Sequence, residues 1–171
     1  MEERSGLVTL HGKPVTLVGQ PLEVGDPVPD VELLDGDLEP VPLTSFRGKT
    51  LVLATVPSLD TDVCDREART FNQRATELGE GVALVVASVD LPFAQSRWCG
   101  AAGVDRVHTL SDHRDVACGR ACGVLIKELR LLARAIFVAD ADGTVRYAQL
   151  VPEVASEPDY EEAIAAVQAL A

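Results

Sequence analysis

Residues 51–64 read Leu-Val-Leu-Ala-Thr-Val-Pro-Ser-Leu-Asp-Thr-Asp-Val-Cys, an apolar run followed by a short polar loop that ends at a cysteine. The run Leu51–Val56 does not alternate polar and apolar positions, which is typical of a strand buried on both faces of a sheet. Apolar residues then recur at spacings of four, three, four and three, as they do along one face of an amphipathic helix. These residues are Cys64, Ala68, Phe71, Ala75 and Leu78. The stretch therefore predicts a buried strand that leads directly into a helix.

The rest of the chain contains more strands and helices of the same kinds. Val82–Val89 and Ala135–Ala139 are unbroken apolar runs and predict two further buried strands. Val145–Val151 is expected as an edge strand that pairs with the 135–139 strand across the turn at Asp140–Gly143. Helices are expected at 92–102, 114–122 and Pro158–Ala169. The last of these begins with a proline and an aspartate, which suit a first helical turn.

The N-terminal region is predicted to contain less regular structure. Residues 7–18 predict two short strands around the turn Gly12–Pro14, and this hairpin is expected as an extension within residues 1–20. Residues 21–49 are rich in Pro, Gly and Asp, with one short strand expected near Val31–Leu34. The order of strands and helices indicates an α/β fold around a central sheet. A length of 171 residues suits a single domain that spans 1–171.

The composition argues against several classes of partner. The chain carries a formal charge of −12, so it is expected to repel nucleic acids and anionic membrane surfaces. No apolar run approaches the ~20 residues that a bilayer span needs, and residues 1–12 lack the pattern of a secretory signal. We therefore expect a cytoplasmic location, where thiols stay mostly reduced. Four cysteines then suggest redox chemistry, metal binding or core packing before structural disulfides.

Cys64 is the strongest candidate for a reactive residue. Because it lies at the start of the expected helix, the free N–H groups and the partial positive charge there favour its thiolate form. Asp60, Asp62 and Asp65 oppose that effect, so a cation is required from elsewhere in the chain. Arg134 suits this role because it enters an apolar strand, where an unpaired charge is costly.

Each of these residues also has a simpler interpretation. A cysteine at a helix start is more often a small buried apolar residue. A threonine three residues before such a cysteine, as Thr61 is, more often serves simply as the N-cap of the helix. An arginine such as Arg134 more often belongs simply to an ion pair at the surface or rim of the protein. Position alone leaves both sets of interpretations open.

The order of these residues matches a known pattern. Pro57, Thr61 and Cys64 stand in the Pro-x-x-x-Thr-x-x-Cys arrangement of the peroxiredoxin active site. Almost the whole chain resembles one branch of that family, the bacterial thiol peroxidases, which are atypical two-cysteine peroxiredoxins. The most specific match is 90–100, Asp-Leu-Pro-Phe-Ala-Gln-Ser-Arg-Trp-Cys-Gly. Further matches lie at 10–15, 71–78, 133–135, 149–153 and 157–160.

The resemblance implies a fold and a role for each matching residue. The fold is thioredoxin-like, with a central mixed sheet flanked by helices. Cys64 is implied as the peroxidatic nucleophile and Cys99 as the resolving cysteine. Thr61 and Arg134 would bind the peroxide and the sulfur, and Pro57 would shield the pocket from water. The resemblance implies no cofactor and no metal.

The partners follow from the same resemblance. The substrate would be a hydroperoxide, with organic and lipid hydroperoxides preferred over hydrogen peroxide. Thioredoxin would be the reductant, and a second copy of the chain would complete a homodimer.

The implied reaction proceeds in three steps. The Cys64 thiolate takes the distal oxygen of the hydroperoxide and becomes a sulfenic acid, which condenses with Cys99 to a disulfide that thioredoxin reduces. The two cysteines lie 35 residues apart on separate predicted helices, and a disulfide needs Cα atoms within about 7 Å. We therefore expect the segments 60–66 and 95–103 to open in the oxidised form.

Cys118 and Cys122 depart from the family pattern. Their i, i+4 spacing places them on one face of a short helix. Core packing is the simplest interpretation. A second disulfide, an alternative resolving thiol and half of a metal site remain open.

Two other functions compete with a peroxidase. A disulfide oxidoreductase on the same fold needs two cysteines in a C-x-x-C motif, and position 61 is Thr61. A thioredoxin-like redox sensor or relay would form the same disulfide but would turn over poorly. The missing C-x-x-C motif and the family resemblance together favour a peroxidase, and the resemblance implies thioredoxin as its reductant and an antioxidant function.

Overall fold

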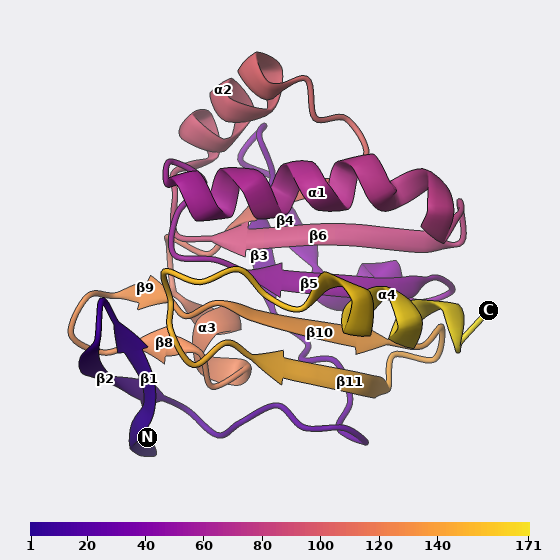
Figure 1. The fold of residues 1–171 in the computed structure, drawn as a ribbon. Coiled ribbons are helices and arrows are strands. Elements are labelled where there is room, and N and C mark those ends of the chain that lie inside the picture. Colours follow the sequence, from indigo (N-terminus) through magenta and orange to yellow (C-terminus); the bar gives the residue numbers. More distant parts are fainter.

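The computed structural model describes residues 1–171, apart from the side chain of Thr76, and its central element is a seven-stranded mixed sheet (Figure 1). The strand order is β11-β10-β5-β6-β7-β3-β4, with β5, β6 and β7 parallel and the other neighbours antiparallel. The strands are β3 Glu32–Leu34, β4 Pro40–Pro42, β5 Thr50–Thr55, β6 Val82–Ser88, β7 His108–Ser111, β10 Ala135–Ala139 and β11 Val145–Leu150. The predicted α/β, thioredoxin-like fold is confirmed.

The three unbroken apolar runs form the middle of this sheet. They are β5, β6 and β10, and nearly all their residues are buried. Such strands are covered on both faces, which is why their sequences do not alternate. As predicted, β11 pairs with β10 at one edge of the sheet.

Helices cover one face of the sheet. α1 Asp62–Leu78 and α4 Tyr160–Gln168 lie on the same side (Figure 1). The predicted stripe of α1 packs with alternate residues of the central strands, among them Val52, Leu84 and Ile136. Gly79, with φ of 87°, caps the C-terminus of α1. α2 Pro92–Ala102 follows β6 and matches its predicted range.

A second, four-stranded sheet packs against the other face together with the short helix α3 Ala117–Ala121. Its order is β1-β2-β8-β9. The strands are β1 Glu3–Leu10, β2 Lys13–Val18, β8 Leu125–Ile126 and β9 Leu131–Leu132. The predicted hairpin is thus confirmed, although its turn lies at His11 and Gly12, which have φ of 50° and 79°. The hairpin is joined to the body by β8 and by a bond from the Thr9 N–H to the Pro152 carbonyl.

Several short elements were absent from the sequence prediction. They are β4, β7, β8, β9 and the 3-10 helix η1 Leu43–Phe46, each of two to four residues. Stretches this short give no periodicity to recognise, because a strand of four residues samples each face only twice.

Two helix boundaries also differ from the prediction. α3 begins at Ala117 and not at 114, since Val116 has a left-handed φ of 46° and the Asp112 carboxylate accepts the first helical N–H groups. α4 begins at Tyr160, because Asp159 is its N-cap and accepts the Glu162 N–H. Pro158 and Asp159 therefore precede the helix and do not form its first turn.

Substitution of Gly19 tests how closely the end of the hairpin approaches α3. A Cβ there would lie 2.1 Å from the Arg120 carbonyl oxygen, whereas a Cβ at Gly25, which has the same φ of 99°, meets nothing within 4 Å. We expect Gly25→Ala to lower the free energy of unfolding by about 1 kcal/mol for the left-handed backbone alone. Gly19→Ala should lower the free energy of unfolding by about 1–3 kcal/mol more than Gly25→Ala does, because the added methyl group overpacks the contact with Arg120. Urea unfolding of both reduced variants measures the difference, and equal losses would contradict the close approach.

Candidate active site

The loop between β5 and α1 holds the start of the helix in place. The Thr61 hydroxyl oxygen accepts the backbone N–H of Cys64 at 3.3 Å, so Thr61 is the N-cap. The same hydroxyl donates to the Ser58 carbonyl at 3.0 Å. The capping interpretation of Thr61 is therefore confirmed, and it places Cys64 in the first turn, where the backbone N–H groups point toward the loop.

Asp90, two residues after the end of β6, anchors this loop. Its carboxylate accepts the Ser58 hydroxyl at 2.6 Å, the Leu59 N–H at 2.8 Å and the Ser88 hydroxyl at 2.7 Å. The fully buried Ser88 also accepts the side-chain amide of Gln95 at 3.0 Å. A buried polar network of this kind fixes the loop relative to the first turn of α2.

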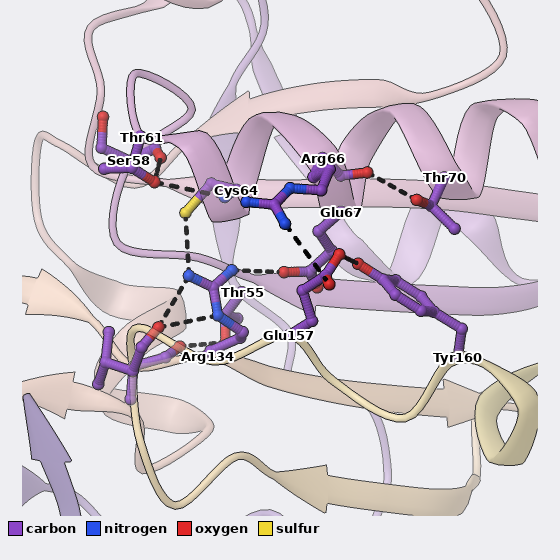
Figure 2. A network of polar contacts seen from close by, with 12 residues as sticks. Thr55, Ser58, Thr61, Cys64, Arg66, Glu67, Thr70, Arg134, Glu157 and Tyr160 are labelled. Carbon is purple, nitrogen blue, oxygen red and sulfur yellow. Dashed lines mark hydrogen bonds and ion pairs between the residues drawn. The ribbon is translucent and has the colours of Figure 1, made fainter.

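Arg134 lies beside the Cys64 sulfur, as the sequence analysis expected (Figure 2). Its Nη2 donates to Cys64 Sγ at 3.3 Å, and Nε and Nη2 donate to the Val154 carbonyl at 3.0 and 2.9 Å. Nη1 donates to Glu67 Oε2 at 2.5 Å. Although burial lowers the pKa of the Arg134 guanidinium, Glu67 and Cys64 raise it above its ordinary value.

The sheet register brings these distant residues together. Ala135 is paired with Thr55, the last residue of β5, and Arg134 directly precedes Ala135. The Thr55 hydroxyl also donates to the Ala133 carbonyl at 2.8 Å. Arg134 therefore enters the sheet opposite the loop that leads to Cys64, and only 1% of its surface is exposed.

Glu67 is a site residue that the sequence analysis missed. It follows Cys64 by three residues, so both lie on the inward face of α1. Its side chain is fully buried, and among the described residues its Oε1 finds no hydrogen-bond partner. Burial raises the pKa of the Glu67 carboxyl to about 7, although Arg134 lowers it. The signal available in the sequence was that this glutamate directly precedes Ala68, a residue of the apolar stripe. A carboxylate buried at such a position requires a cationic partner.

Tyr160 and Glu157 lie on the side of Glu67 that faces α4 (Figure 2). The Tyr160 hydroxyl donates to Glu157 at 3.0 Å, and Arg66 reaches the same carboxylate at 3.9 Å. Burial and then the charge of Glu67 raise the pKa of Tyr160. The 157–160 motif thus lies next to the buried ion pair.

The acidic neighbours of Cys64 are less buried than the cysteine, although Asp62 lines the cavity beside Arg134. Asp60 and Asp62 are exposed, and Asp65 is paired with Arg69 at 2.8 Å. Arg66 and Arg69 point along other faces of α1, as expected, so neither takes the place of Arg134.

A cavity of about 380 Å³ opens beside Pro57, Thr61 and Arg134. Most of the remaining wall is apolar and comes from the second sheet, its connecting loop and the segment after β11. These residues are Leu10, Ile126, Leu129, Leu131, Val154 and Ala155. The N-terminal hairpin also contributes His11, so the extension forms part of the wall.

Cys99 is not joined to Cys64. Both are free thiols, and Cys99 lies half-buried on α2 with its sulfur 3.3 Å from the Thr109 hydroxyl. The structure therefore brings together Pro57, Thr61, Cys64 and Arg134, and it leaves Cys99 on a separate helix with a different partner.

Cys118 and Cys122 are buried on the face of the sheet opposite to Cys64. A hydrogen bond with Cys122 and burial raise the pKa of the Cys118 thiol well above its ordinary value. This environment favours the packing interpretation. Within the described part of the chain, no group of three or more His, Cys, Asp or Glu residues is arranged to hold a metal, and no helix is long and apolar enough to cross a bilayer.

Comparison with known proteins identifies the family of the chain. Residues 23–164 match the model of the Redoxin family, and the chain belongs to that family. It is 52% identical to a thiol peroxidase of Bacillus subtilis over 95% of this chain and 97% of the relative. A thiol peroxidase of Staphylococcus aureus is 50% identical over 93% and 96% of the two chains.

Solved structures show the same fold. A peroxiredoxin-like protein from Aquifex aeolicus superposes with a TM-score of 0.91 at 41% identity, over 98% of this chain and 99% of that one. A thiol peroxidase from Chromobacterium violaceum gives a TM-score of 0.84 over 95% of each chain, at 23% identity. The resemblance to the bacterial thiol peroxidases that the sequence analysis described is confirmed, and the chain is an oxidoreductase of the peroxiredoxin type.

Glu67 gives the stability of the protein a specific pH dependence. Its pKa of about 7 in the folded chain lies above the ordinary value of 4.5. The folded state therefore holds the proton more tightly, and stability falls as pH rises from 4.5 to 7. Over this range the free energy of unfolding should fall by about 3 kcal/mol, and the Glu67→Gln variant should not show this fall. Urea unfolding of the reduced proteins at about pH 4.5 and pH 8 measures this linkage, and a pH-independent difference between wild type and variant would contradict the assignment.

Proposed function

We propose that Cys64 is the peroxidatic cysteine of a thiol-dependent peroxidase. The single observation that carries the proposal is the contact of 3.3 Å between Arg134 Nη2 and Cys64 Sγ. A fully buried sulfur beside a buried guanidinium has its negative charge stabilised where little water is present to do so. The thiolate is the nucleophilic form of cysteine.

In the first step, Cys64 attacks a hydroperoxide that enters through the cavity beside Pro57. The sulfur bonds to the distal oxygen, the O–O bond breaks, and the leaving alkoxide takes a proton to become an alcohol. Arg134 donates hydrogen bonds to the oxygen on which charge develops, and the Thr61 hydroxyl orients the peroxide. Pro57 keeps water from the sulfur on the cavity side. The product on the protein is a Cys64 sulfenic acid.

In the second step, Cys99 is the resolving cysteine. Its thiol displaces the hydroxyl of the sulfenic acid, which releases water and forms the Cys64–Cys99 disulfide. Thioredoxin then reduces this disulfide by thiol exchange, and both cysteines return as thiols. The electrons come from the two cysteine thiols and then from thioredoxin, so the cycle uses no cofactor.

The apolar cavity supports organic and lipid hydroperoxides as preferred substrates. Leu129, Leu131 and Val154 line its wall, and Leu129 is 44% exposed. An alkyl group that covers these side chains removes apolar surface from water, which hydrogen peroxide cannot do. Hydrogen peroxide remains a substrate because the reacting groups are the same.

The organisation of the protein is also part of the proposal. We infer a single domain over 1–171, in which the extension 1–20 is integral, because Arg4 donates to Gly19 and Gly123 and Leu10 lines the cavity. A homodimer is expected from the family resemblance, and the exposed Phe93, at 64%, offers apolar surface for it. A cytoplasmic location is inferred from the sequence.

A redox sensor without efficient turnover is the competing function. It would use the same two cysteines, but the similarity to thiol peroxidases over nearly the whole chain does not favour it. Turnover with thioredoxin distinguishes the two.

The test is a coupled peroxidase assay with thioredoxin, thioredoxin reductase and NADPH. We expect Cys64→Ser to abolish turnover, because it removes the thiol that lies against Arg134. Cys99→Ser should lose multiple turnover with thioredoxin but retain one rapid oxidation of Cys64. The ratio kcat/KM should be higher for cumene hydroperoxide than for hydrogen peroxide. Full multiple turnover in Cys64→Ser would contradict the proposal.

A peptide map of the oxidised wild type identifies the resolving residue. The expected product is a Cys64–Cys99 disulfide. A bond from Cys64 to Cys118 or Cys122 would overturn the choice of Cys99 and leave the role of Cys64 intact.

A further inference from the structure

The side chains next to the two redox cysteines are bonded to each other. Trp98 Nε1, directly before Cys99, donates to Asp65 Oδ1, directly after Cys64, at 2.7 Å. The indole N–H can only donate, so it requires such an acceptor when it is partly buried. This contact joins the first turns of α1 to the second half of α2.

Arg69 strengthens the same junction. Its Nε donates to the other Asp65 oxygen, Oδ2, at 2.8 Å, and its Nη1 donates to the carbonyl of Ala102, the last residue of α2, at 3.3 Å. Both oxygens of Asp65 are therefore engaged, and one α1 side chain also binds the C-terminal end of α2. We refer to Asp65, Arg69 and Trp98 as the interhelix latch.

Helix geometry and the latch together turn Cys64 and Cys99 toward different partners while both helices are intact. Adjacent helical residues are rotated by about 100° around the axis. When Asp65 and Trp98 face each other, Cys64 and Cys99 are turned away from the line between them. The observed partners agree, because the Cys64 sulfur contacts Arg134 and the Cys99 sulfur contacts Thr109.

The motion needed to join the cysteines is limited to short segments. The Gln95 amide is 2% exposed and donates to Ser88 and to the Leu110 carbonyl, which holds the first turn of α2. The Asp90 network holds Ser58 and Leu59 in the same way. Opening is thereby confined to the start of α1 and the second half of α2, the part that the latch closes.

We propose that the interhelix latch sets the rate at which Cys99 resolves the oxidised Cys64, with Asp65 as the positioning residue. The proposal rests on the peroxidase function proposed above. The bond from Trp98 to Asp65 must break before the disulfide forms. Only then can the start of α1 and the second half of α2 rotate and unwind so that the two cysteines meet. An intact latch therefore prolongs the life of the sulfenic acid.

The latch consequently affects which of two competing reactions consumes the sulfenic acid. Condensation with the Cys99 thiol gives the disulfide and water. A second hydroperoxide instead transfers one oxygen to the same sulfur, which gives a sulfinic acid and an alcohol. Because only the second path depends on peroxide concentration, slower condensation makes the enzyme more sensitive to inactivation by excess peroxide.

The experiment compares Trp98→Phe and Asp65→Asn with wild type in single turnover with cumene hydroperoxide. Dimedone trapping and mass spectrometry follow the sulfenic acid, the disulfide and the sulfinic acid separately. In Trp98→Phe we expect condensation about tenfold faster, the effect of losing a hydrogen bond to a charged group. The peroxide concentration that gives half sulfinic acid should rise by about the same factor. Asp65→Asn should change both in the same direction.

Asp60→Asn is the matched control. It removes a negative charge from the loop directly before α1, and the Asp60 side chain is exposed and lies outside the cavity lining. Its condensation rate should equal that of wild type. Unchanged or slower condensation in both latch variants, in folded proteins that form the sulfenic acid normally, would overturn the latch. Absence of a dimedone adduct in wild type would instead contradict the proposed function itself.

Discussion

The site depends on one constraint, which is that the charge of Arg134 is buried and must be satisfied from inside the protein. With 1% of its surface exposed, the guanidinium binds a carbonyl, a carboxylate and a sulfur. The carbonyl of Val154 comes from the segment after β11, and Glu67 and Cys64 come from α1. Arg134 directly precedes β10 and lies between these segments. The sheet register and the position of α1 are therefore both needed to place these partners around the buried guanidinium.

The same helix that presents Cys64 to Arg134 also controls the second half of the cycle. Its inward face carries Cys64 and Glu67, while Asp65 on a neighbouring face holds α2. The proposed chemistry therefore needs two states of one segment. A closed state stabilises the thiolate and binds peroxide, and an open state lets Cys99 reach the sulfur. The buried Asp90 network lies at the boundary between the fixed and the moving parts.

Sequence patterns predicted the central part of the fold because long unbroken apolar runs and the α1 stripe have few other interpretations. They placed Cys64, Thr61 and Arg134 correctly in space, since a buried arginine needs a partner. Short elements such as β7 gave no periodicity. Glu67 was missed because it lies beside the apolar stripe and is polar, so the stripe pattern does not include it. The bond between Trp98 and Asp65 depends on how two helices pack side by side, which no local pattern encodes.

The most direct test of the account is the second-order rate constant for oxidation of Cys64, measured in single turnover in Arg134→Met combined with Glu67→Gln. Glu67→Gln alone is the reference, so that neither protein carries an unpaired buried carboxylate. The account predicts a rate constant at least about a hundredfold lower in the double variant, the usual effect of removing a donor that stabilises developing charge. A folded double variant that reacts as fast as the reference would contradict the central role of Arg134.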